Sequence, residues 1–223
     1  MFTREHSAIR AALAAAALAL SGCAAQDEGS IKDNVSQPAG IAPIQRIRGE
    51  ALIGKDGYGF TPCGSDRQRI LVLVAPARDF LERFLEPGGK PEFFVDAWAR
   101  EKEGKLEVVG IERAYTEGPR CGAAREEVQF VARGTEPFWS LQVAPSGWQL
   151  QRPDQPLLSV TGVPIKQGPA YAWSSVSPEA TVEIVPGYCA DGMADAASAW
   201  QARVSVGELR LSGCAYRGEL RLP

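Results

Sequence analysis

The sequence predicts a mainly β protein with two small antiparallel β-barrel-like domains, the first OB-like with one helix, and each with one disulfide. Two observations carry this prediction. Two successive blocks of short apolar-alternating segments follow one another along the chain, and only one segment between them has a helical period. Each block also contains two of the five cysteines. We place the boundary between the blocks near residues 119–125.

The first block, residues 46–121, predicts the order strand, strand, strand, helix, strand, strand. The segment 76–86 ("PARDFLERFLE") changes the apolar period from two to about 3.6, and Pro76 stands near its start, as at the first turn of a helix. A helix between the third and fourth of five strands is the arrangement of an OB-type barrel. The predicted strands are 46–54, 57–63, 67–75, 91–101 and 105–115, and the apolar helix face is Phe80, Leu81, Phe84 and Leu85.

The second block, residues 126–223, consists almost entirely of strand-like segments separated by Gly, Pro, Asp and Ser. This spacing predicts an eight-stranded antiparallel barrel or sandwich. The exception is 189–198 ("CADGMADAAS"), where we expect a loop with a helical turn. The predicted strands are 128–134, 137–143, 147–153, 157–164, 170–176, 180–186, 199–207 and 208–216.

The N-terminus has the pattern of a secretory signal, which we assign to residues 1–22. A basic start with Arg4 and Arg10 precedes the uncharged run 11–20. Ten helical residues extend about 15 Å, which is half the thickness of a bilayer core, so the run is too short to span a membrane.

The run leads into Leu-Ser-Gly-Cys, which ends at Cys23 and resembles the lipobox of bacterial lipoproteins. The resemblance implies a thioether-linked lipid on Cys23 and cleavage before it, and Ala24 at the next position implies sorting to the outer membrane. The alternative is an ordinary signal-peptidase site near Ala24-Ala25. Small and polar residues then follow, so we predict a lipidated, flexible tether over 23–45. Its reach of roughly 25 Å would hold the folded part just off the membrane, in the periplasm.

Composition excludes several classes of function. The formal net charge is −3, so the chain has no electrostatic footprint for nucleic acid. The one histidine, His6, lies in the predicted signal; the mature chain cannot use a Ser-His-Asp or Cys-His mechanism, nor offer an imidazole to a metal. Two carboxylates would suffice for a glycosidase, but nothing singles out a pair. We therefore predict a non-catalytic protein with no cofactor and no metal.

The four cysteines beyond Cys23 are Cys63, Cys121, Cys189 and Cys214. In an exported chain they indicate two disulfides, with three possible connectivities. The two-block division selects Cys63–Cys121 and Cys189–Cys214. The alternatives are free thiols and a zinc site, but zinc sites usually have cysteines two to four residues apart, a spacing that this chain lacks.

Three motifs stand out: "GTEPFW" (134–139), "CADGMAD" (189–195) and "GCA" (213–215). Together they resemble an uncharacterised family of Gram-negative envelope lipoproteins and predicted membrane proteins, over residues 128–216. That resemblance implies no activity. The first block is loosely similar, at "FTPC" (60–63), to copper-stress envelope lipoproteins; it lacks their C-x-x-C motif, so copper chemistry is not carried over.

The motifs have a structural and a functional interpretation. Successive strand residues face opposite sides, so one of the two aromatics that end "GTEPFW" belongs in the core, while Glu136 caps a turn or pairs with an arginine. Asp191 suits an Asx turn, and its motif has too few oxygen ligands for an EF-hand calcium loop. The functional interpretation is a rim that binds a sugar or a partner protein. The candidate rim residues are Glu136, Trp139, Asp191, Met193 and Asp195.

These observations predict an outer-membrane-anchored periplasmic lipoprotein that binds an envelope component, which is a partner protein, a glycan or a small lipophile. A lysozyme inhibitor is one alternative, because "SGCAY" (212–216) resembles the S-G-x-x-Y loop of membrane-bound lysozyme inhibitors. The other is an envelope-stress sensor that reads its own disulfide or lipidation state.

Overall fold

The computed structural model describes residues 41–55, 57–85, 87, 89–123, 125–191 and 195–220, without the side chain of residue 191. The predicted signal 1–22, the lipidation site Cys23 and most of the predicted tether lie outside these residues. Within them the chain is mainly β, with fourteen strands in one hydrogen-bonded sheet, helix α1 and the short 3-10 helix η1.

The first five strands form a closed OB-like barrel, as predicted. Strand β1 pairs with β2 and β4, β2 pairs with β3, and β4 pairs with β5. The barrel closes because β3 pairs with β5 in parallel, whereas the other pairs are antiparallel. The strands are β1 (Gln45–Gly54), β2 (Gly57–Pro62), β3 (Arg69–Leu73), β4 (Glu92–Lys102) and β5 (Lys105–Tyr115).

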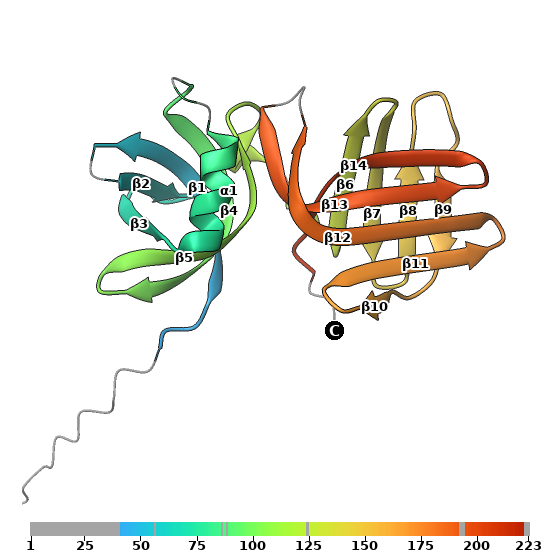
Figure 1. Ribbon diagram of the computed structural model, residues 1–223, viewed down its shortest axis with the longest axis horizontal. Helices are drawn as coiled ribbons and strands as arrows, with labels where there is room; N and C mark the ends of the chain where they lie inside the picture. The colour runs from blue at the N-terminus through green and yellow to red at the C-terminus, as the bar shows by residue number, and fades with distance from the viewer. Residues whose placement is uncertain are drawn as a thin grey trace, which may run out of the picture. The chain divides into compact units, whose positions relative to one another are not determined.

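Helix α1 (Ala75–Phe84) lies between β3 and β4, where the change of period predicted it. A proline occupies the first turn, where its missing N–H costs no helical hydrogen bond. Ala77, Phe80 and Leu81 are buried at helical spacing and join the hydrophobic cluster of the first barrel. Figure 1 shows the helix lying against this barrel.

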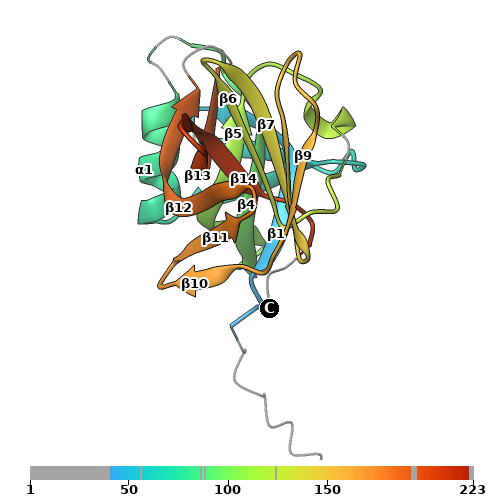
Figure 2. The ribbon, with the colours of Figure 1, turned by 90° about the vertical axis from the view of Figure 1, so that its right-hand side faces the viewer.

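The second part is a nine-stranded antiparallel meander in the order β10-β11-β12-β13-β14-β6-β7-β8-β9. Figures 1 and 2 show its strands arranged around a common interior as a barrel-like body. The strands are β6 (Phe130–Thr135), β7 (Phe138–Ala144), β8 (Gly147–Gln151), β9 (Leu158–Thr161), β10 (Ile165–Gln167), β11 (Ala170–Val176), β12 (Glu179–Asp191), β13 (Ala196–Val206) and β14 (Leu209–Arg217).

Two details differ from the expected strands. The described part of the second barrel has nine strands, whereas eight were predicted. The additional strand is β10, whose three residues are exposed and too few to give a periodic signal. The predicted loop with a helical turn over 189–198 is wrong at both ends, because β12 continues to Asp191 and β13 begins at Ala196. The two ends pair with each other, as Cys189 with Ser198 and Asp191 with Ala196. Small, polar residues concealed this hairpin from a pattern based on hydrophobicity.

The interior of the second barrel is filled by a hydrophobic cluster that contains four tryptophans. Trp139, Trp148, Trp173 and Trp200 are all at most 6% exposed. Phe130 and Tyr171 pack among them, with the Phe130 ring 5.2 Å from that of Trp200.

The two barrels share structure. The first three residues of β13 pair with β5, as Ala196 with Tyr115 and Ser198 with Arg113, and Ala197 joins the hydrophobic cluster of the first barrel. Residues 41–223 accordingly form one compact unit, which contains two hydrophobic clusters. The predicted division into independent domains at residues 119–125, where η1 (Arg120–Gly122) lies, stays a prediction.

A buried charge cluster joins the barrels. Asp96 on β4 is fully buried and accepts two hydrogen bonds from Arg46, of 2.7 and 2.8 Å. Arg48 and Arg113 pair with the same carboxylate at 3.6 and 3.5 Å. We call these four residues the arginine cluster. Arg46 also donates to backbone carbonyls of residues 217 and 218, so the cluster holds the end of β14.

The charges around Arg46 stabilise its protonated form. Burial acts to lower the pKa of Arg46, but the hydrogen bond to Asp96 and the charges of Asp96, Glu112 and Glu219 outweigh it, so the pKa is raised. Glu112 is itself buried and accepts the backbone N–H of Arg217 at 2.6 Å. The junction between the barrels is therefore held by charged hydrogen bonds as well as by apolar contacts.

Both predicted disulfides are present. Cys63 and Cys121 have Cα atoms 5.3 Å apart and tie the residue after β2 to η1. Cys189 and Cys214, with Cα atoms 5.4 Å apart, tie β12 to β14. Each bridge joins two cysteines of one sequence block.

Candidate functional site

Residues of all three sequence motifs line one cavity of about 520 Å³, on the outer side of strands β6, β14, β13 and the end of β12. We call it the motif groove. "GTEPFW" contributes its first three residues, "CADGMAD" its first two and "GCA" its first two. The lining residues are Arg133, Gly134, Thr135, Glu136, Cys189, Ala190, Gln201, Ala202, Arg203, Ser212, Gly213 and Cys214.

Strand register explains why segments so far apart in sequence meet here. Cys214 pairs with Arg133 on one side and with Gln201 on the other, so these three residues form a row across β6, β14 and β13. The disulfide from Cys214 then brings Cys189 to the same row. The motif groove therefore forms because β14, the last strand, pairs with β6, the first strand of the second barrel.

Part of each motif is structural. Trp139 is only 4% exposed, and its indole lies against two glycines of neighbouring strands. A Cβ at Gly134 would lie 2.2 Å from Trp139 Nε1, and one at Gly213 would lie 2.0 Å from the Arg133 carbonyl and 2.8 Å from the indole. Trp139 Nε1 also donates to the Ser212 carbonyl at 3.3 Å. Trp139 therefore belongs to the core, not to an exposed rim.

The other aromatic of "GTEPFW" is at the surface. Phe138 is 61% exposed, and among the residues that the structure describes it is the one aromatic side chain classed as exposed. It lines a second cavity of about 490 Å³, which shares three residues with the motif groove and adds Gln151 and Arg152 at the end of β8. The β6–β7 turn thus separates two adjoining cavities and presents Phe138 and Glu136 between them.

Hydrogen-bonding side chains of several kinds surround the motif groove. Arg133 and Arg203 are both more than 60% exposed and form surface pairs with Glu126 at 3.1 Å and with Glu183 at 3.9 Å. Such exposed pairs contribute little, at about 0–1 kcal/mol, so a ligand can replace them at small cost. Gln201, Thr135 and Ser212 add an amide and two hydroxyls.

The predicted rim residues do not all lie together. Glu136 lines the motif groove, and Trp139 lies beneath it. Asp191 ends β12 next to Ala190 of the groove, while Asp195 lines a different cavity beside Lys90 and Tyr188. Met193 lies outside the described residues.

Sequence reasoning missed Phe138, Arg133, Arg203 and Gln201. Strand alternation could have found Arg133, Gln201 and Arg203, because each stands between two buried residues of β6 or β13. For Phe138, alternation shows only that it and Trp139 face opposite sides. Their meeting at one groove could not have been found, since it depends on the pairing of β14 with β6.

Within the described part of the chain, no group of three or more His, Cys, Asp or Glu side chains is placed to hold a metal ion. No helix in that part has the length and apolarity needed to cross a membrane. Comparison with protein-family models, with curated proteins and with solved structures found no match to the chain. The resemblance to envelope lipoproteins therefore stays a prediction from the motifs.

Proposed function

We propose that this protein is a non-catalytic, lipid-anchored protein of the bacterial outer membrane whose second barrel binds an envelope glycan in the motif groove. The observation that carries the proposal is the meeting of all three motifs at one groove, beside an exposed aromatic side chain. The predicted signal and tether are the sequence features that support a periplasmic location of the groove.

The chemistry of the groove favours a glycan over the other envelope components. Guanidinium and amide groups offer several N–H donors in one plane, and hydroxyls both donate and accept, which matches the hydroxyl and acetamide groups of a sugar. An exposed ring such as Phe138 offers an apolar face against which the C–H face of a sugar can pack. The exposed arginines would additionally attract carboxylates carried by a glycan such as peptidoglycan.

Co-sedimentation with purified peptidoglycan sacculi tests the proposal. We use the full chain with Cys23→Ala, so that membrane attachment does not contribute. The double variant Phe138→Ala/Arg203→Ala should bind at least fivefold less protein per mass of sacculi, because it removes the stacking face and a charged donor without opening the core. The matched control, Val176→Ala/Arg210→Ala, changes an exposed apolar residue and an exposed arginine of the same barrel that do not line the groove.

The proposal is contradicted if the Cys23→Ala protein does not bind sacculi, or if the double variant and the control bind equally. Thermal unfolding of all the variants shows whether a loss of binding reflects a loss of fold. The anchor is tested separately: Cys23→Ala should abolish incorporation of labelled palmitate and move the protein from the membrane fraction to the soluble fraction.

Among the described residues, the segment that suggested the lysozyme-inhibitor alternative is not a loop. Residues 212–216 lie inside β14, which is paired on both sides by β13 and β6, and Cys214 is bound in a disulfide. A segment held within a sheet does not project as an inhibitory loop. Inhibition of lysozyme by micromolar protein would restore this alternative.

A further inference from the structure

A separate cavity of about 420 Å³ lies where the two barrels meet. We call it the junction cavity. Its walls come from β5, the linker between the barrels, and strands β6, β13 and β14. The lining residues are Arg113, Ala114, Tyr115, Glu117, Gly118, Pro119, Ala123, Glu126, Arg133, Ala196, Ala197, Ser198, Cys214 and Tyr216. Its volume lies within the usual range of small-molecule sites, which often occur between domains.

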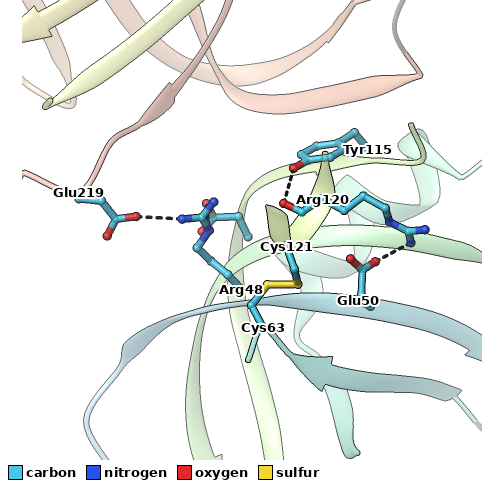
Figure 3. Close-up of a disulfide and its surroundings, with 8 residues drawn as sticks. Arg48, Glu50, Cys63, Tyr115, Arg120, Cys121 and Glu219 are labelled. Atoms are coloured by element: carbon cyan, nitrogen blue, oxygen red, sulfur yellow. Dashed lines mark hydrogen bonds and ion pairs between the residues drawn. A yellow bond between two sulfur atoms is a disulfide. The ribbon is translucent and has the colours of Figure 1, made fainter. Parts of the chain in front are cut away.

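The linker wall of the junction cavity is fixed in place. The disulfide Cys63–Cys121 ties it to the first barrel, and Arg120 forms an ion pair with Glu50 at 2.6 Å. The hydroxyl of Tyr115 donates to the Arg120 carbonyl at 3.3 Å. Figure 3 shows these contacts on one side of the disulfide, with the Arg48–Glu219 pair on the other. A wall held at three points is preorganised, so a ligand need not order it on binding.

The charged groups of the lining already have partners. Glu126 accepts from the Tyr216 hydroxyl at 2.7 Å and pairs with Arg133. Glu117 pairs with Lys90 at 2.8 Å. Arg113 forms an ion pair with Asp96 at 3.5 Å without a hydrogen bond from its Nε, and its guanidinium lies 3.9 Å from the centroid of the Tyr216 ring. A charged ligand would have to disrupt the buried contacts of Arg113 and Glu126, whereas a neutral one leaves them in place. The exposed pairs of Glu117 and Arg133 contribute little to this selection.

The remaining surface of the cavity is mainly apolar. It is lined by the rings of Tyr115 and Tyr216, four alanines, Gly118 and Pro119, with Ser198 as a further polar residue. Tyr216 is only 7% exposed. This burial raises the pKa of its hydroxyl to about 12, although the charges of Arg113 and Arg133 act in the opposite direction. Apolar walls of low hydration bind apolar molecules in preference to ions.

We infer that the junction cavity is a binding site for a small neutral lipophile, such as a molecule with one or two fused rings. The junction cavity shares Arg133 and Cys214 with the motif groove, but its other lining residues do not line that groove, and the inference does not rest on glycan binding there. The apolar lining and the existing charge pairs both select against a charged ligand.

Fluorescence titration with two matched probes tests this inference. N-phenyl-1-naphthylamine is neutral, and 8-anilino-1-naphthalenesulfonate is a similar molecule with a negative charge. The Cys23→Ala chain should bind the neutral probe at one site, with an affinity at least tenfold higher than for the anionic probe. Ala123→Phe, which fills the cavity from the linker, should weaken binding of the neutral probe at least tenfold.

Two further variants make the result specific. Ala123→Asp puts a charge on the same wall and should also weaken binding of the neutral probe at least tenfold. Ala75→Phe, the same change as Ala123→Phe at an exposed residue of α1 outside the cavity, should leave binding unchanged. Thermal unfolding confirms that each variant is folded. The inference is overturned if the parent does not bind the neutral probe, prefers the anionic one, or binds equally after Ala123→Phe in a folded protein.

Discussion

The two barrels are built from similar strands but are stabilised in different ways. The second barrel encloses a cluster rich in tryptophan, and its motif glycines give room to one of these indoles. The first barrel has a core of smaller residues with six alanines, one of them Ala197 of β13. The arginine cluster lies outside that core, where the end of β14 attaches. All three sequence motifs belong to the second barrel.

This difference suggests a division of roles. In the first barrel, the arginine cluster stabilises the fold and holds the end of β14. In the second barrel, inward-facing residues pack the core, whereas outward-facing residues line the motif groove. Perturbing the first barrel should therefore change stability more than glycan binding. In the second barrel, a change on the inner side of a strand should lower stability, and a change on the outer side should weaken glycan binding.

The largest effect should come from the arginine cluster. Asp96→Ala leaves three arginines without their shared carboxylate, and removing one partner of a buried ion pair typically costs about 3–5 kcal/mol. Urea denaturation measures this as a lower free energy of unfolding. Glu183→Ala, which removes an exposed pair at 3.9 Å, is the control and should cost less than about 0.5 kcal/mol. Equal effects of the two changes would refute the role given to the cluster.

Removal of either disulfide should cause the next largest loss of stability. In the chain-entropy model, closing loops with sequence separations of 58 and 25 residues contributes about 4 and 3.5 kcal/mol for Cys63–Cys121 and Cys189–Cys214. Double Cys→Ala variants should thus lose comparable stability by urea denaturation. Binding of sacculi should distinguish them, because only Cys189–Cys214 lines the motif groove. A loss of binding confined to the Cys63–Cys121 variant would contradict the assigned roles.

The motif glycines should have a smaller effect. Gly134→Ala and Gly213→Ala introduce a Cβ that Trp139 or the facing backbone must avoid, and such overpacking costs about 1–3 kcal/mol. Gly162→Ala is the matched control, since its Cβ would meet no atom within 4 Å and its backbone is not in the left-handed region. Calorimetric melting temperatures should fall for the first two variants only. A similar fall for Gly162→Ala would show that the tight contacts are not the cause.

The smallest effect should appear at high pH. An unfolded tyrosine ionises near pH 10.0, whereas burial raises the pKa of Tyr216 to about 12. Between these values the unfolded state releases its proton first, so the free energy of unfolding falls as the pH rises, by up to about 2 kcal/mol for this residue. Tyr216→Phe should lack this part of the fall in denaturation curves from pH 9 to 12. Identical pH profiles would mean that Tyr216 is not kept neutral by burial.

Much of the fold could be predicted because it rests on local patterns. The helix followed from the change of period at residues 76–86, and the disulfides followed from cysteines grouped by block. The hairpin over 189–198 was missed because Ala, Ser and Asp give no apolar alternation, and its strand pairing comes from neighbours distant in sequence.

The candidate site was only partly predictable. The motifs drew attention to Glu136. Alternation alone could not decide whether Phe138 or Trp139 is the exposed aromatic, since it says only that the two face opposite sides. Gly134 on β6 and Gly213 on β14 decide it, because a side chain at either position would occupy the space of the indole. That contact joins β6 to β14, and no local pattern indicates it.

Amide hydrogen exchange with and without soluble peptidoglycan fragments tests the central claim most directly. The account predicts that the fragments slow exchange in the β6–β7 turn and in the adjoining parts of β13 and β14, and that exchange in the first barrel stays unchanged. Slower exchange confined to the first barrel, or no change anywhere at saturating fragment concentration, would contradict it.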